Sequence, residues 1–84
     1  MLVAKVKKVK AKENNVIVCE FDNGIQKKYD MTILIKKYAI FKKLENNRNL
    51  FNQVSVDIGG YGVSWNDEID LAAEEIWENG EEIE

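Results

Sequence analysis

Residues 16–30 read VIVCEFDNGIQKKYD and predict a β-hairpin, the unit from which the rest of the fold can be worked out. Ile17, Cys19 and Phe21 alternate with other residues at the period of a strand that buries one face. Asp22-Asn23-Gly24 follows, and glycine there accepts the positive φ that a tight hairpin turn requires. The chain is then expected to return as the second strand of the hairpin.

Upstream of this hairpin, residues 2–12 predict a further strand rich in valine and lysine. Its apolar positions change face between Val6 and Val9, because the strict alternation of a strand fails there. One extra residue at Lys7-Lys8 would restore a single apolar face, so we expect a β-bulge at this point. The turn signal at residues 13–15 joins this strand to the hairpin.

Downstream of the hairpin, short helices are expected. Asp30 is predicted to cap a helix that begins at Met31, because its carboxylate can accept hydrogen bonds from the amides of the first turn. Leu34, Tyr38 and Phe41 follow at the spacing of one buried helical stripe. A second start signal, at residues 45–47, predicts another short helix.

The last third of the chain predicts a second hairpin and a final helix. Residues 54–58 and 61–65 are the expected strands, and Gly59-Gly60 forms the turn between them. Asp70 is predicted to cap the final helix, which ends at Gly80. Val54, Val56 and Ile58 are expected to face inward from the first of these strands. The second strand is expected to carry Tyr61, Val63 and Trp65 on one face.

The 84 residues have room for one domain, expected over residues 1–80, with a frayed acidic tail at 81–84. The predicted class is α+β, a single compact domain of antiparallel hairpins with about five strands and two or three short helices. One cysteine excludes a disulfide scaffold, and a hydrophobic share of 45% excludes a disordered chain. No apolar run reaches the roughly 18 residues that span a bilayer, so we expect a cytoplasmic protein.

The residue inventory argues against an enzyme. The chain has no histidine, which removes the commonest general base near neutral pH and a frequent metal ligand. Cys19 is expected to be a core residue, and the acids between Asp67 and Glu75 lack the spacing of a calcium loop. We therefore expect no catalytic, cofactor-binding or metal-ligating residues. A hydrolase built on a carboxylate pair is the remaining enzymatic alternative.

Charge divides the chain into two halves. Residues 1–43 carry eleven lysines against four acids, a balance of +7, whereas residues 44–84 carry Arg48 against eleven acids, a balance of -10. The halves either neutralise each other in one fold or present separate charged surfaces. A basic face offers an alternative function, an accessory nucleic-acid-binding domain, although the first strand has no aromatic residue for stacking. The lysines expected on this face are Lys5, Lys7, Lys10, Lys12 and Lys27.

A second candidate surface lies on the strand at residues 61–65. Gly60, Gly62 and Ser64 leave one face bare, and a bare face permits close approach of another molecule. Tyr61 and Trp65 are expected at its rim, where large aromatic side chains make good contact residues. Residues 54–58 carry little charge, so a homodimer through that edge is also open.

Several short motifs occur in a fixed order over nearly the whole chain. In sequence they are Phe21-Asp22-Asn23-Gly24, Tyr29-Asp30-Met31, Phe41 with Leu44, Leu50-Phe51, Val54-Ser55-Val56-Asp57 and Trp65-Asn66-Asp67-Glu68-Ile69-Asp70-Leu71. Together they resemble a small bacterial domain family of unknown function, the one numbered 2442.

The resemblance implies a compact α+β domain and supplies no catalytic residues. Its recurrent positions Asp30, Trp65 and Asp70 are interpreted as a helix cap, a core residue and a second helix cap. Similar domains are often encoded beside another small protein, a layout like that of toxin–antitoxin pairs. The leading hypothesis is thus a non-enzymatic regulatory module that binds a small protein partner encoded nearby, with nucleic acid unlikely to be bound by the chain alone.

Overall fold

The computed structural model describes residues 4–83 and confirms the α+β class, with antiparallel sheets and short helices. The strands are β1 (Val6–Ala11), β2 (Val16–Phe21), β3 (Gln26–Asp30), β4 (Ser55–Val56), β5 (Gly62–Ser64), β6 (Asp70–Ala72) and β7 (Glu81–Ile83). The helices are α1 (Thr32–Lys37), α2 (Ala39–Lys42), α3 (Arg48–Phe51) and α4 (Ala73–Asn79), with a 3-10 turn, η1, at Ile58–Gly60.

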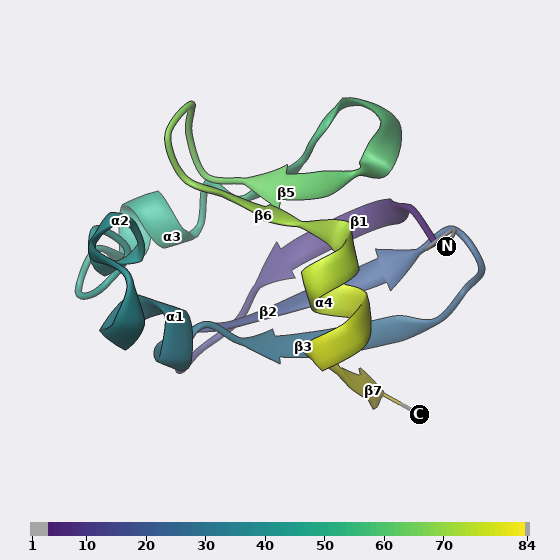
Figure 1. Ribbon diagram of the computed structural model, residues 1–84, viewed down its shortest axis with the longest axis horizontal. Coiled ribbons are helices and arrows are strands. Elements are labelled where there is room, and N and C mark those ends of the chain that lie inside the picture. The colour runs from purple at the N-terminus through teal and green to yellow at the C-terminus, as the bar shows by residue number, and fades with distance from the viewer. Residues whose placement is uncertain (1–3, 84) are drawn as a thin grey trace.

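The elements form two sheets with helices at one side and one end (Figure 1). The larger sheet has the order β1-β2-β3-β7, and the smaller has the order β4-β5-β6. In Figure 1, α4 crosses in front of the larger sheet, while α1, α2 and α3 gather at its left end. Buried side chains such as Ile17, Phe21 and Ile76 fill the space between these layers. One face of the larger sheet is therefore packed, and its other face is open.

The first hairpin forms as its sequence predicts. Gly24 has a φ of +89°, and its amide donates to the Phe21 carbonyl at 2.9 Å. The bulge in β1 is confirmed as well, because its register against β2 shifts between Val6 and Lys8. The extra residue turns both Val6 and Val9 toward the packed face, where they lie beside buried residues of β2.

The first helical region is shorter than the pattern predicts. The Asp30 carboxylate accepts a hydrogen bond from the Thr32 amide at 2.9 Å, but the helix begins at Thr32 and its cap position is Met31. Tyr38 is extended, with φ -120° and ψ 128°, and this separates α1 from α2. The predicted buried stripe is therefore wrong at Tyr38, which is exposed, because the helical spacing does not continue through that residue.

Replacing Asp30 by asparagine is expected to flatten the loss of stability in acid. The hydrogen bond to Thr32 lowers the pKa of Asp30 below its ordinary 3.8. A carboxylate with a lowered pKa stabilises the fold above its unfolded pKa, and this contribution is lost as the pH falls through the folded pKa. Asparagine keeps the acceptor without the titration, so thermal midpoints between about pH 2 and pH 5 should fall less steeply in Asp30→Asn. Equal slopes for the two proteins would contradict this.

The second half of the chain corrects two predicted features. Asp70 is not a helix cap, because it lies in β6 and pairs with Ser64 of β5, and α4 begins only at Ala73. Residues 70–72 complete the smaller sheet, so the helix cannot begin earlier. Ile58 does not face inward, because β4 ends at Val56 and the chain enters η1.

The acidic tail also differs from its prediction. Glu81–Ile83 form β7 and pair with β3 instead of fraying, while Glu84 lies outside the described residues. Lys28 Nζ lies 3.0 Å from Glu81 Oε1, so the basic and acidic halves of the chain meet at this edge. Opposite charges across paired strands favour the pairing.

Candidate interaction surfaces

The face predicted to be bare around Gly60 and Gly62 is covered by other backbone segments of the same chain. Both glycines are buried, and a Cβ atom at Gly60 would come to 2.7 Å from the Val6 carbonyl oxygen. A Cβ atom at Gly62 would lie equally close to the Leu71 carbonyl oxygen, at 2.7 Å. The absent side chains thus admit the backbones of β1 and β6, which corrects the expectation of an open contact face.

The other residues of that predicted surface divide between core and surface. Ser64 Oγ donates to Asp57 Oδ1 at 2.7 Å, so the hydroxyl is used inside the hairpin. Trp65 is only 3% exposed and belongs to the core, whereas Tyr61 is 67% exposed. The Lys5 ammonium lies 5.0 Å from the centre of the Tyr61 ring. Tyr61 is therefore the residue of this predicted surface whose large side chain is exposed.

The turn before Tyr61 carries an exposed apolar side chain that the sequence pattern placed inside. Ile58 is fully exposed at the start of η1. The turn is fixed by two backbone hydrogen bonds of 2.9 Å, from the Gly60 amide to the Asp57 carbonyl and from the Asp57 amide to the Gly62 carbonyl. The adjacent Gly59-Gly60 pair is the sequence signal that could have shown that Ile58 is exposed. Such a pair marks a turn, and the alternation of a strand ends where a turn begins.

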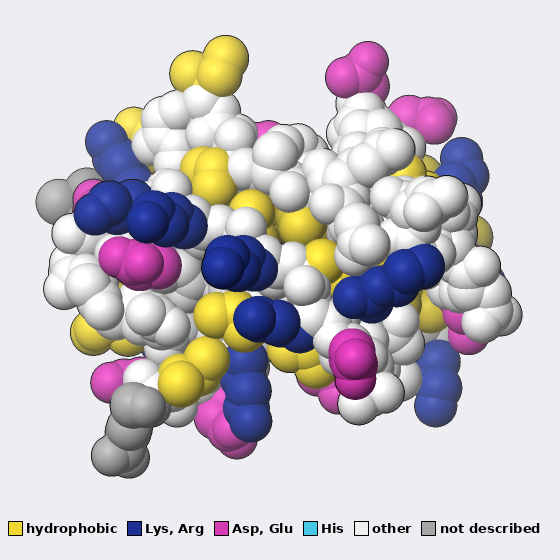
Figure 2. Space-filling view, turned by 180° about the vertical axis from the view of Figure 1, so that it is seen from behind, with side chains coloured by type: hydrophobic (Ala, Val, Ile, Leu, Met, Phe, Trp, Pro, Cys, Tyr) yellow, Lys and Arg dark blue, Asp and Glu magenta, His cyan; other side chains and the backbone are white. Residues whose placement is uncertain are grey.

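Two lysines of β1, and Lys12 directly after it, lie on the open face of the larger sheet. The register pairs Lys8 with Glu20 and Lys10 with Val18, and the alternation of the strand places Lys12 on the same side. Figure 2 views this open side of the molecule and shows basic side chains in a row, with apolar side chains between them. These three lysines thus form one basic surface, which we call the lysine face (Lys8, Lys10 and Lys12).

The five lysines predicted to converge do not share that face. Lys27 pairs with Cys19 and points to the packed side, where its ammonium lies 4.4 Å from the centre of the Trp77 ring. It also donates to the Trp77 carbonyl at the end of α4, where the helix dipole favours a cation. Lys5 lies over an aromatic ring at the end of the sheet, and Lys7 occupies the bulge.

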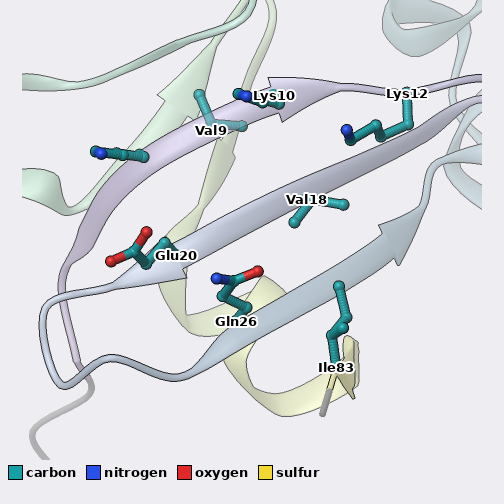
Figure 3. A pocket seen from close by; sticks show the side chains of 8 residues that line it. Val9, Lys10, Lys12, Val18, Glu20, Gln26 and Ile83 are labelled. Carbon is teal, nitrogen blue, oxygen red and sulfur yellow. The ribbon is translucent and has the colours of Figure 1, made fainter.

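The lysine face borders a shallow groove of about 420 Å³ (Figure 3). Val18 and Ile83 provide its apolar surface, and Glu20 and Gln26 lie at one end. The lining residues are Lys8, Val9, Lys10, Lys12, Val18, Glu20, Gln26 and Ile83. Apolar contacts beside a row of cations suit a ligand that is itself apolar and acidic.

Comparison with protein families matches one model, described as a protein of unknown function (DUF2442), over residues 6–82. The chain belongs to the DUF2442 family. Comparisons with curated proteins and with solved structures gave no match. The geometry of the DUF2442 domain is therefore the basis for any functional proposal.

The single cysteine of the DUF2442 domain lies in the core. Cys19 is fully buried, and burial raises the pKa of its thiol to about 12, so the sulfur stays protonated at neutral pH. Within residues 4–83, no three acidic or cysteine side chains gather as metal ligands would. The helices of the same segment are all too short or too polar to cross a membrane.

Few opposite charges of the DUF2442 domain form ion pairs within the described residues. Two ion pairs form among residues 4–83, namely Lys28 with Glu81 at 3.0 Å and Lys43 with Glu68 at 3.6 Å. Neither pair uses the lysine face. Glu74 is exposed on α4, which covers the opposite side of the larger sheet. The basic and acidic halves thus neutralise each other in part, at two ion pairs that leave the lysine face out.

Proposed function

We propose that this DUF2442 domain is a non-enzymatic regulatory module that binds an acidic segment of a small protein partner. The observation that supports it most is the lysine face, three cations that line a partly apolar groove and have no ion-pair partner among residues 4–83. Unpaired surface charges of one sign attract an oppositely charged partner and fix its orientation. We place this pair in the cytoplasm, as two halves of a toxin–antitoxin-like system encoded side by side.

Several features favour a protein over a nucleic acid as the ligand. The groove is lined by no aromatic side chain from residues 4–83, although stacking supplies much of the affinity for single strands. Val18 and Ile83 gain little from phosphates but do gain from apolar side chains.

The chemistry of the groove also favours binding over catalysis. Its titratable residues are lysines and one carboxylate, whereas glycoside hydrolysis needs two carboxylates that flank the bond. The buried Cys19 thiol lies on the opposite, packed face of the sheet and cannot serve the groove as a nucleophile.

Charge reversal of the lysine face is expected to abolish partner binding. The tagged full chain, expressed in its native cell, should recover one small acidic protein in equal amount. The Lys8→Glu/Lys10→Glu/Lys12→Glu variant should recover at least about tenfold less of the partner than the unchanged chain does. Like charges would then face each other across the contact. Recovery is measured by affinity purification and quantitative mass spectrometry. Binding should also weaken as the salt concentration rises.

The matched control changes the same number of charges elsewhere. Lys36, Lys37 and Lys42 are exposed on α1 and α2, away from the groove, so their triple change to glutamate should leave recovery intact. Equal loss in both variants would refute a specific role of the lysine face. Recovery that disappears after nuclease treatment would refute the protein partner and favour nucleic acid.

A further inference from the structure

A second groove, of about 470 Å³, lies between α1 and α4, on the side of the molecule that α4 covers. Its apolar wall comes from Ile33, Leu34 and Tyr38, and Ile33 is 72% exposed although it is a large aliphatic residue. Asp30, Glu75 and Asn79 supply the polar side of the groove. An apolar wall opposite carboxylates is a different chemistry from that of the lysine face.

Glu75 is a charged residue of this groove that accepts two side-chain hydrogen bonds. Its Oε2 accepts a hydrogen bond from the Tyr29 hydroxyl at 2.8 Å and another from Asn79 Nδ2 at 2.9 Å. Both acceptor directions of that oxygen are thereby used, while Oε1 receives no donor from residues 4–83. Burial, with a smaller contribution from the bond to Glu75, raises the pKa of Tyr29, so the phenol remains the donor in this hydrogen bond.

We propose that this groove binds an arginine side chain from a basic partner segment. The guanidinium would pair with Glu75 through Oε1, and its alkyl stem would lie along Ile33 and Leu34. A planar fork of donors matches a carboxylate, and guanidinium is weakly hydrated, so arginine suits a half-apolar groove better than lysine does. Asp30 adds a second negative charge, because its hydrogen bond to Thr32 lowers its pKa and keeps it ionised.

The wall of the groove already holds one cation of this chain. The Lys37 ammonium lies 5.4 Å from the centre of the Tyr38 ring, and Lys37 also lines the groove. A ring that attracts one cation can attract another, but two cations in one groove repel each other. Lys37 is therefore a competitor of the incoming arginine, and its removal should strengthen binding.

The test uses two short peptides, acetyl-Ala-Leu-Arg-Leu-Ala-amide and the same peptide with citrulline in place of arginine. Citrulline keeps the shape of the side chain and removes its charge. Each peptide is titrated into the isotope-labelled full chain, and NMR shifts are followed at Ile33, Glu75 and Asn79. We expect the arginine peptide to bind at least about tenfold more tightly than the citrulline peptide.

Variants of the chain make the result specific to the groove. Glu75→Gln retains acceptors for Tyr29 and Asn79 and should remove the preference for arginine, whereas Glu78→Gln, which changes an exposed acid of the same helix outside the groove, should retain it. Lys37→Gln should tighten binding about twofold to fivefold.

Equal binding of the two peptides, an equal loss in both glutamine variants, or weaker binding in Lys37→Gln would overturn the proposal. The inference is independent of the proposed acidic partner, because the lysine-face variant should still bind the arginine peptide. Loss of arginine binding in that variant would also count against the α1–α4 groove as the site.

Discussion

Replacing Trp65 by alanine is expected to cost about 3–5 kcal/mol of unfolding free energy. The indole is 3% exposed and packs against Phe41 and Phe51, with ring centres 6.4 Å and 6.3 Å away. Alanine would leave a cavity where the smaller sheet meets the helices. Small domains have a total stability of about 5–15 kcal/mol, so Trp65→Ala should lose a large share of the stability of this domain. Urea denaturation followed by circular dichroism measures the loss.

Phenylalanine at the same position is expected to be tolerated much better. The Trp65 Nε1 atom is buried and has no hydrogen-bond acceptor among residues 4–83. A buried donor without a partner costs about 1–3 kcal/mol, and Trp65→Phe removes that cost while it keeps most of the ring. The net loss should therefore stay below about 1.5 kcal/mol. If Trp65→Phe is as unstable as Trp65→Ala, the indole nitrogen contributes in a way that this packing does not explain.

Features set by local chemistry were predictable from the sequence. Gly24 takes the positive φ that its hairpin turn needs, and Asn47 accepts a hydrogen bond from the Leu50 amide at 3.2 Å to start α3. The bulge after Val6 follows from the change of face in the apolar pattern. In each case the deciding interaction joins residues close in sequence.

Features set by distant pairing were not predictable in the same way. Asp70 has the chemistry of a helix cap, but the smaller sheet needs its segment as a strand beside β5. Glu81–Ile83 look like a solvated tail until Lys28 of β3 is placed beside Glu81. Local propensity is overridden wherever tertiary pairing gains more.

The candidate surfaces show the same division. A basic strand was evident from composition, and Lys10 and Lys12 do lie together on it. The sequence could not show that Lys27 points to the other side, because that depends on its register with Cys19. The α1–α4 groove combines residues from β3, α1 and α4, so no single stretch of sequence signals it.

Two isoleucines that the alternating pattern treats alike are expected to differ strongly when each is changed to alanine. Ile17 is fully buried in β2, and Ile17→Ala should cost about 2–5 kcal/mol of unfolding free energy. Ile58 is fully exposed, and Ile58→Ala should change stability by no more than about 0.5 kcal/mol. The chemical change is identical, so the comparison isolates burial. Urea denaturation of both variants at one temperature provides the measurement.

The pair of isoleucines also tests where the second hairpin ends. If β4 continued through Ile58, as alternation with Val56 suggests, its side chain would be buried and its removal would be costly. In the structure β4 ends at Val56, Gly59 in the following turn has a φ of +84°, and the Ile58 side chain is exposed. A loss at Ile58 as large as that at Ile17 would show that the turn packs against the core. A negligible loss would support a β4 strand that ends before Ile58, with an apolar side chain on the turn that folding does not need.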